Sequence, residues 1–456
     1  MRGQVVSAIE PVRAARARQF STADHVSVSV LWLALYAQWL TMVPIIVPDQ
    51  IAGIVGPDVA TKEGIAGTII AAGAAVALIV APVAGALSDR RRAPHGRRRP
   101  FLVVGMLGSC GALALLALFG PGSSVLLYAV AILNLQFWWN WASGPYAGLI
   151  PDVVSAGAQS VASGWMNVMS ILGTIIGNVL VSALYHPGRV LPVIAAFVAL
   201  NIASLVLTLR GVREPPAAGA NDAFDLRTFI RSFYLDPQEH ANFYWVLITR
   251  LLGNMGIWSV FAFLLFYIES VVGIEREAAA QLLPTLLGAG AILAIPASFL
   301  GVKLAERHGV VRLVRATSWI MAAAAMGYVL IALRPGLALV VPVILVFSAA
   351  YGAYGAVDWA LALRVLPAGQ DVGKDMGIWH VAMVLPQILG PAATGWLITG
   401  IKAVGSPQLA YAAAFAIAAV WFTLAAMLVA RVRLPPAAAG RMPERGGPNP
   451  STQRSR

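Results

Sequence analysis

The chain has 456 residues, of which 59% are hydrophobic and 11% are charged, and its formal net charge is +12. Soluble domains carry about 25% charged residues, so this composition excludes an ordinary soluble protein. Apolar runs of about 20 residues, each long enough to cross a bilayer as a helix, recur along the whole length. They predict an all-α membrane protein with twelve transmembrane helices, at residues 26–47, 64–86, 101–119, 123–149, 160–184, 190–209, 243–270, 278–301, 312–333, 337–362, 375–400 and 408–430.

The basic residues predict the orientation of these helices, because Lys and Arg collect in short loops on the cytoplasmic side. With a cytoplasmic N-terminus, 26 of the 32 Lys and Arg residues fall on that side and five fall outside. We therefore expect a multi-pass plasma-membrane protein with both termini in the cytoplasm. The asymmetry also accounts for the net charge, so we expect the lipid bilayer, and no nucleic acid, as a partner. Cys110 is the only cysteine, and the sequence predicts no metal site and no cofactor.

The loop between the second and third helices, GALSDRRRAPHGRRRP (residues 85–100), combines one acid with six arginines. A carboxylate in this setting will be ionised and paired. The arginines alone could anchor the loop on the cytoplasmic side, but an anchor has no use for the acid or for the second glycine. We therefore predict a gating loop, whose charge pairs form in one conformation and break in another. Its residues are Gly85, Asp89, Arg90, Gly96, Arg97 and Arg98.

The fourth helix contains FWWNWASGPYAG (137–148), in which the indoles lie deeper than the interfacial belts where tryptophan gathers. Aromatic rings offer apolar faces with a polar edge, and amides offer uncharged donors and acceptors. These side chains either line a substrate cavity or pack between helices and face lipid. We expect Gly144-Pro145 to interrupt and bend this helix. The predicted substrate-binding residues are Trp32, Tyr36, Trp39, Trp138, Asn140, Trp141, Asn167, Asn254, Trp258, Tyr354, His380 and Gln387.

Two halves of the chain are related by sequence. GWMNVMSILGTIIG (164–177) aligns without gaps with GIWHVAMVLPQILG (377–390), an offset of 213 residues. Two six-helix repeats joined by a linker are a layout that places a substrate site between the halves. The sequence therefore predicts the following division: a cytoplasmic tail at 1–25, a six-helix bundle at 26–209, a linker with an amphipathic helix at 210–242, a second bundle at 243–431 and a disordered tail at 432–456.

Three ionisable residues are predicted to lie within the membrane, where an unpaired charge is costly. Arg250 on the seventh helix and Asp358 on the tenth lie at similar depth, so we expect a pair. That pair is either a structural bridge or a protonatable Asp358 held by Arg250. His380 is the repeat partner of Asn167 and titrates near neutral pH, although it could also be a packing residue. The predicted proton-coupling residues are Asp358, His380 and Arg250.

These motifs resemble those of the major facilitator superfamily. The pattern G-x-x-S-D-R followed by G-R-R-R-P is similar to its loop between helices two and three. Gly144-Pro145-Tyr146 and the stretch 377–387 resemble the branch that contains the sucrose-type and glycoside–pentoside–hexuronide cation symporters. The resemblance extends over residues 26–430. It implies a transporter in which a substrate site between the halves opens alternately to each side of the membrane.

The chain also departs from that branch. The sugar-anchoring arginine expected on helix four of plant sucrose carriers is replaced by Ala147, and helix eleven has His380 where an amide is usual. The segment 64–86 has no acid of the kind that sodium-coupled melibiose carriers use. We therefore predict a monomeric symporter of a small polar solute, a sugar or glycoside, coupled to a proton. A proton-antiport exporter of an amphiphilic or lipid-like compound is the alternative, a non-transporting membrane sensor is a third class, and no motif indicates an enzyme.

Overall fold

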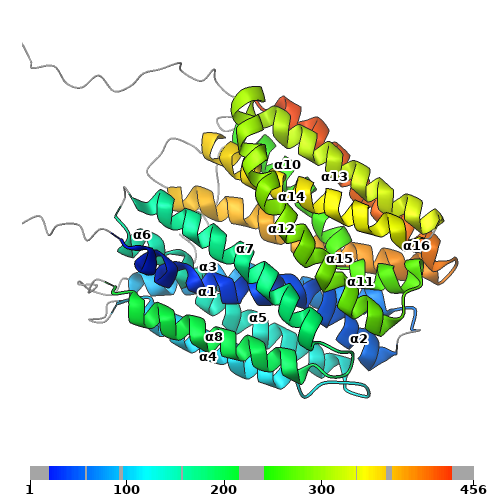
Figure 1. The fold of residues 1–456 in the computed structure, drawn as a ribbon, viewed down its shortest axis with the longest axis horizontal. Coiled ribbons are helices and arrows are strands. Elements are labelled where there is room, and N and C mark those ends of the chain that lie inside the picture. Colours follow the sequence, from blue (N-terminus) through cyan, green and yellow to red (C-terminus); the bar gives the residue numbers. More distant parts are fainter. Residues whose placement is uncertain are drawn as a thin grey trace, which may run out of the picture.

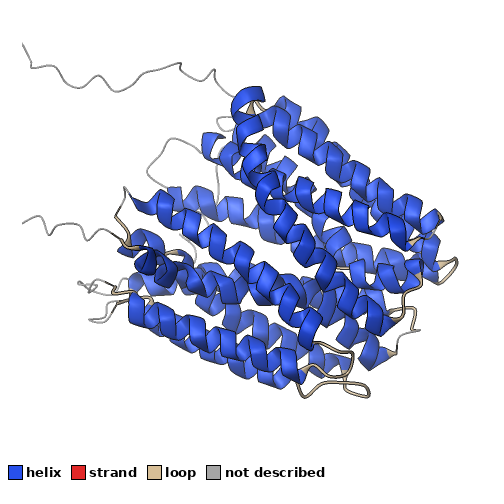
Figure 2. Cartoon of the chain, viewed as in Figure 1, coloured by secondary structure: helices blue, strands red, loops and turns tan. Residues whose placement is uncertain are grey.

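The computed structural model describes residues 20–56, 59–91, 96–155, 158–214, 241–334, 336–365 and 372–433. These residues form helices joined by short loops (Figure 2). The amphipathic helix predicted within the linker and the predicted disordered tail lie outside the described residues, apart from the short ends of each.

The helices of the first half account for six predicted spans. A π-helical turn and two bends add short elements, so the labels outnumber the spans. The elements are α1 (Thr22–Thr41), η1 (Met42–Ile46), α2 (Val47–Val55), α3 (Lys62–Arg90), α4 (Arg99–Leu116), α5 (Val125–Ala147), α6 (Leu149–Val153), α7 (Gln159–Leu184) and α8 (Leu191–Gly211).

The second half follows the same order. Its elements are α10 (Ala241–Phe261), α11 (Leu264–Tyr267), η3 (Ile268–Val272), α12 (Arg276–His308), α13 (Val310–Leu333), α14 (Leu337–Val365), α15 (Val372–Lys402), α16 (Pro407–Leu428) and η4 (Val429–Arg431). Across the described residues, eleven helices are long and apolar enough to cross a membrane. The count is twelve when the pair α10 and α11–η3, bent by 49°, is taken as one span. The predicted all-α membrane fold is confirmed.

The two halves lie side by side, the first from blue to green and the second from green to red (Figure 1). The described ends of the chain, at residues 20 and 433, lie toward the same end of the bundle, which we call the terminal face. The opposite end, with the loops around residues 59–61, 273–275 and 403–406, is the distal face. α3 packs along α15, and α7 packs along α12, so each half supplies one helix to each of the two main contacts between the halves.

Glycine allows the helices of the first half to approach closely. A Cβ atom at Gly177 of α7 would lie 2.1 Å from the carbonyl oxygen of Ala37 on α1, and one at Gly173 would lie 2.3 Å from that of Leu33. The residue that aligns with Gly177 in the internal repeat is Gly390, and it lies against Met255 and Trp258 of α10. The repeated sequence therefore has a repeated packing role.

Two helix boundaries differ from the sequence prediction. The first helix does not end at residue 47 but continues to Val55, because the π-helical turn accommodates Pro48 and because Asp49 has partners in the interior. The helix that contains Pro145 continues to Ala147 instead of breaking at Gly144. A Cβ at Gly144 would lie 2.1 Å from the carbonyl oxygen of Ala81, so this glycine permits close contact with α3.

Replacing Gly177 with alanine should destabilise the protein by about 1–3 kcal/mol, as expected for overpacking of a tight interface. Alanine has a higher helix propensity than glycine, so a loss of stability in this variant must come from the tight packing. Thermal unfolding in detergent measures it. The matched control is Gly164→Ala on the same helix, where nothing lies within 4 Å of the added atom, and this variant should be at least as stable as the parent. Equal stability of both variants would contradict the packing described.

Candidate functional site

Three tryptophans meet where the two halves touch, near the middle of the helices that carry them. The ring of Trp39 on α1 lies 5.0 Å from that of Trp139 on α5 and 5.8 Å from that of Trp258 on α10, measured between centroids. We call these three residues the tryptophan junction. Because α1 and α5 belong to the first half and α10 to the second, the junction joins the two halves through aromatic contact alone.

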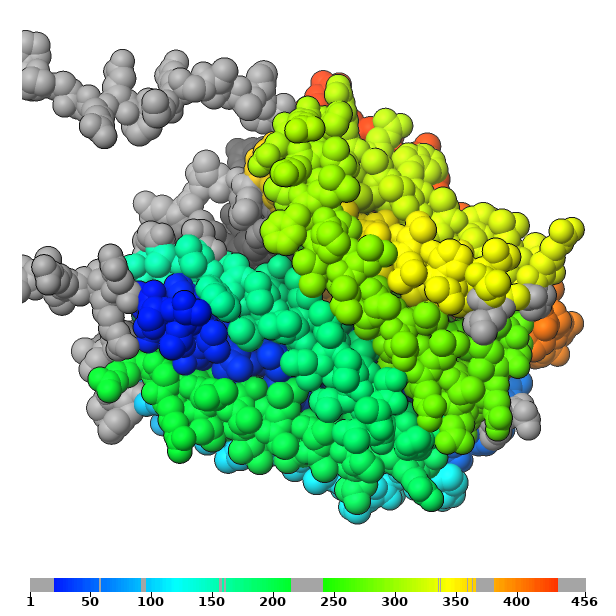
Figure 3. All heavy atoms as spheres, in the orientation of Figure 1, coloured from blue at the N-terminus to red at the C-terminus, as the bar shows by residue number. Residues whose placement is uncertain are grey.

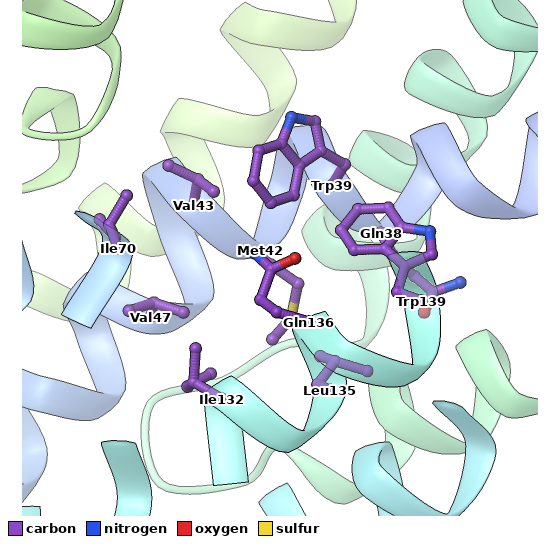
Figure 4. Close-up of a pocket in the computed structure, with 10 residues that line it drawn as sticks. All are labelled: Gln38, Trp39, Met42, Val43, Val47, Ile70, Ile132, Leu135, Gln136 and Trp139. Carbon is purple, nitrogen blue, oxygen red and sulfur yellow. The ribbon is translucent and has the colours of Figure 1, made fainter. Parts of the chain in front are cut away.

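A small cavity of about 20 Å³ lies beside the junction within the first half. Figure 4 shows the rings of Trp39 and Trp139 at its edge, with the side chain of Gln136 close by. Gln38 is buried and donates to Asn201 over 2.6 Å. Ligand sites usually enclose roughly 300–1,000 Å³. The cavity is smaller than this, so binding of a solute here requires the halves to move. The lining is uncharged: Gln38, Trp39, Met42, Val43, Val47, Ile70, Ile132, Leu135, Gln136 and Trp139.

Two of the predicted indoles lie on another face of α5. Trp138 packs on α4, where its ring fills the space that a side chain at Gly108 would need. Trp141 stacks on Phe101 of α4 and on Phe137, with centroid distances of 5.5 and 5.6 Å. Both lie within the first half, as the packing alternative anticipated. The indole between them, Trp139, is the one that reaches the junction, and the prediction omitted it.

The aromatic residues predicted on α1 lie along a second path toward the terminal face. Trp32 lies 6.1 Å from Tyr36 and 5.3 Å from Tyr146 of α5. Tyr146 is buried and holds α1 directly, since its hydroxyl donates to the carbonyl of Val28 and accepts from the amide of Leu31. This contact fixes the spacing of α1 and α5 on the terminal side of the junction.

Three of the four predicted amides share one arrangement: their NH₂ groups donate to the carbonyl four residues earlier on the same helix. This holds for Asn140, Asn254 and Gln387, and Asn140 also lies 3.3 Å from the side-chain oxygen of Gln136. Asn167 is exposed on α7. His380 lies in α15, but its side chain is outside the described residues. The binding roles of these residues stay predictions.

Arg250 and Asp358 form the pair expected from their depth. The guanidinium Nη1 donates to Oδ2 of the carboxylate, and the two side chains are only 8% and 5% exposed. Tyr354, one turn before Asp358, is also buried. A buried pair is sensitive to the loss of either charge. Protonation of Asp358 would cancel its charge and weaken the contact with Arg250, and the role of the pair in proton coupling stays a prediction.

The predicted gating loop forms a dense network at the terminal face. Arg98 donates to Asp152 over 2.5 Å and to Asp89 over 2.7 Å, and it also reaches the carbonyl of Pro145. Arg97 makes a second contact with Asp152 over 2.6 Å, and this hydrogen bond raises the pKa of Arg97. Each partner belongs to the first half. Whether the network opens and closes as a gate stays a prediction.

The second glycine of the loop has a clear structural reason. Gly96 has φ +98°, a conformation that favours glycine, and a Cβ there would lie 2.5 Å from Glu214. Glu214 accepts from the backbone amide of Arg98 over 2.8 Å, and its burial raises the pKa of its carboxyl. The remaining loop residues are peripheral: Arg90 donates to the carbonyl of Ala86, and Gly85 faces the backbone of Gly144.

Sequence reasoning missed a set of charged side chains near the distal face. The sequence assigns Lys62, Arg276 and Lys402 to outer loops and gives them no partners. In the structure Glu269 is 10% exposed and lies 3.6 Å from Lys62. The available signal was the position of acids at helix ends next to long apolar runs, where a charge needs a partner.

Two similar six-helix halves that meet at aromatic side chains and at buried ion pairs define a polytopic membrane protein built from two repeated bundles. The sequence pattern of the Major Facilitator Superfamily matches residues 28–371. The chain therefore belongs to that superfamily. Members of that superfamily are secondary transporters, not enzymes, and they bind small-molecule substrates in a membrane.

Individual relatives are more distant. The sucrose transport protein SUT5 of Oryza sativa, in both indica and japonica rice, is 32% identical over 124 aligned positions, covering 22% of this chain and 23% of the relative. The match thus spans about a quarter of the length of these curated relatives. The crystal structure of the nucleoside transporter NupG matches 90% of this chain and 99% of its own, with a TM-score of 0.69 and 13% identity. A bacterial homolog of the human lysosomal transporter Spinster matches 92% and 100%, with a TM-score of 0.64 and 14% identity.

The coupling between Arg250 and Asp358 can be measured with a double-mutant cycle. Replacing either one with an uncharged residue, Arg250→Met or Asp358→Asn, should cost about 3–5 kcal/mol, because the remaining charge stays buried. The double variant should be more stable than the sum of the single effects predicts. Thermal unfolding in detergent provides the values. Additive effects would show that the two groups do not depend on each other.

Arg98→Ala should loosen the terminal end of the first half, because it removes contacts to two acids and to the carbonyl of Pro145. Loss of a buried charged partner costs on the order of 1–3 kcal/mol or more. Hydrogen exchange should therefore rise in α6, where Asp152 lies. Arg91→Ala is the control, since Arg91 is exposed in the same loop. Unchanged exchange in the Arg98 variant would contradict the role of this network in holding α6.

Proposed function

We propose that this transporter moves a small, uncharged polar solute, a sugar or glycoside, by proton symport through the plasma membrane. The single observation that carries the proposal is the tryptophan junction, which brings aromatic faces from both halves together beside uncharged amides. A sugar presents flat C–H faces and a rim of hydroxyls. Indole rings suit those faces, and the side chains of Gln136 and Asn140 can donate to and accept from the hydroxyls.

The partial similarity to a sucrose transport protein supports the same substrate class. It covers too little of either chain to identify the sugar, and the absence of an arginine at Ala147 implies that binding differs from that in plant carriers. Here the contact would be made by stacking and by amides rather than by a fixed cation. That arrangement favours an uncharged substrate, because no lining residue of the cavity could balance a charge.

A titratable group near the site is required for symport, and Asp358 is our first candidate. Its side chain accepts a hydrogen bond from the buried Arg250, and proton binding would release the pair. His380 on α15 is the second candidate, because its imidazole titrates near neutral pH. An inward proton supplies about 2.3 kcal/mol per 100 mV of membrane potential, so one such group is enough to drive accumulation.

The second candidate function is proton-antiport export of an amphiphilic compound. One observation favours it: eight of the ten residues that line the cavity are aliphatic or aromatic, the exceptions being Gln38 and Gln136. Such a lining would also accept the apolar part of an amphiphile. The two functions differ in direction and in substrate, so transport assays separate them.

The test is uptake into proteoliposomes under an inward proton gradient, with a panel of labelled mono- and disaccharides. We expect accumulation of one sugar. Asp358→Asn should abolish gradient-driven accumulation but retain exchange of labelled for unlabelled sugar, since exchange needs no net proton movement. His380→Ala, run in parallel, identifies the other candidate. Movement of a dye or lipid probe, with no accumulation of any sugar, would establish the exporter instead.

The tryptophan junction gives a second transport prediction. Trp258→Ala should raise KM about 2- to 10-fold, since an aromatic contact of this kind is worth roughly 0.5–1.5 kcal/mol. Trp138→Ala is the matched control, an equal truncation of an indole that packs on α4. Initial uptake rates over a range of sugar concentrations give both values. A larger effect at Trp138 than at Trp258 would rule out the junction as the substrate contact.

A further inference from the structure

Six charged side chains gather between the halves near the distal face. Arg276 Nε lies 2.5 Å from Oδ1 of Asp49, Lys402 Nζ lies 2.9 Å from Oε1 of Glu63, and Lys62 Nζ lies 3.6 Å from Oε2 of Glu269. Each of these three ion pairs joins one half to the other. We call them the distal cluster, and its members are Asp49, Lys62, Glu63, Glu269, Arg276 and Lys402.

Most of the cluster is closed off from solvent, although the side chain of Arg276 is 24% exposed. The side chains of Asp49 and Glu63 are 1% and 0% exposed, and those of Lys62 and Lys402 are 5% and 12% exposed. Tyrosines complete the contacts: Tyr185, which directly follows α7, donates to Asp49, and Tyr411 of α16 donates to Glu63 over 2.9 Å. In this structure the distal side of the transporter is therefore closed by charged side chains that contact one another instead of water.

The pairs balance only while the halves are together. The first half contributes two acids, Asp49 and Glu63, and one base, Lys62. The second half contributes one acid, Glu269, and two bases, Arg276 and Lys402. Parting the halves at the distal face would therefore leave an excess negative charge on the first half and an excess positive charge on the second.

Glu63 is the acid of the cluster best placed to respond to a proton. Both of its hydrogen bonds within the described residues, from Lys402 and Tyr411, go to Oε1. Its other oxygen, Oε2, is buried and has no hydrogen-bond partner among those residues. This oxygen can therefore accept a proton. The neutral acid could keep the hydrogen bond from Tyr411 while losing the ionic contact with Lys402.

We propose that Glu63 is a proton-binding site whose protonation releases the distal closure. The inference rests on the alternating-access part of the proposed function, but it concerns a different acid from Asp358. When Glu63 takes a proton from the distal solution, Lys402 remains a buried cation without its anion. A cation in that position gains by returning to water, so the proton shifts the population toward the open state.

The groups that face Glu63 from the surrounding elements support this direction. Lys402 of α15 and Tyr411 of α16 contact it directly, and the backbone amide of the next residue, Gly64, is held by Thr399 of α15 over 3.1 Å. Lys62 of α3 reaches Glu269 of η3, while Arg276 of α12 pairs with Asp49 of α2. Protonation of Glu63 would remove the ionic partner of Lys402 directly.

Labelling of a buried reporter thiol tests the proposal without any knowledge of the substrate. The background is Cys110→Ser, since Cys110 is the only cysteine. The reporter is Asn178→Cys, because Asn178 is 1% exposed on α7 and faces Gly288 of α12 in the other half. Val404→Cys places a thiol at an 89% exposed position in a distal loop. Its labelling rate measures the intrinsic effect of pH on the thiol, and its extent of labelling measures the fraction of molecules with the distal face outward.

With a membrane-impermeant maleimide outside proteoliposomes, lowering the external pH from about 8 to about 5 should raise the normalised labelling rate of the reporter about tenfold, a population shift that corresponds to about 1.4 kcal/mol. Glu63→Gln imitates the protonated acid. Its reporter should label fast at both pH values and change by less than about twofold, because the acid that carries the response has been removed.

Two variants separate the proton site from simple damage. Tyr411→Phe removes a hydrogen bond but no charge, so its labelling should keep the pH dependence. The exchange Glu63→Lys with Lys402→Glu should restore slow labelling at high pH, because the pair is rebuilt with its ends reversed. An unchanged pH response in Glu63→Gln would overturn the proposal, and fast labelling of the exchanged variant at all pH values would overturn the role of the pair. Neither result depends on which solute is carried.

Discussion

Pairing of buried charge is the constraint on which the rest of this structure depends. In a membrane protein an isolated charge in the interior costs several kcal/mol, so each must find a partner or return to water. The cross-half pairs Asp49–Arg276 and Glu63–Lys402 satisfy that requirement only when the two halves touch. The same contacts that stabilise the charges therefore determine how the halves sit.

The distribution of these contacts is uneven along the membrane axis. Among the described residues, the cross-half ion pairs lie near the distal face, and so does the hydrogen bond between Trp396 and Thr68. At the terminal face, Arg98 and Asp152 bind each other within the first half. A relative movement of the halves would break the distal contacts, while the terminal network could move as part of one rigid half. The halves are thus tied at one end and internally braced at the other.

The sequence predicted the parts of this structure that depend on local pattern. The length of the apolar runs predicted the spans, and the gap-free alignment predicted the repeat. The similar depth of Arg250 and Asp358 in the membrane predicted that they form a pair. It could not choose among Trp138, Trp139 and Trp141, because neighbouring helix positions point about 100° apart and only contacts show which face meets the other half. It also missed Asp49 and Glu63, since nothing in the local pattern says that a helix-end acid meets a base more than 200 residues away.

The two proposed proton sites differ in a way that follows from their partners. Asp358 and Arg250 lie on α14 and α10 of the same half, so movement of the halves as rigid bodies leaves their distance unchanged. Glu63 and Lys402 lie on different halves, so the same movement must separate them. Protonation of Asp358 can therefore respond to what occupies the site, whereas protonation of Glu63 is tied by linkage to the conformation itself. Protonation of an acid whose partner lies in the other half is therefore linked to opening. An acid whose partner lies in the same half can keep its proton while the halves move.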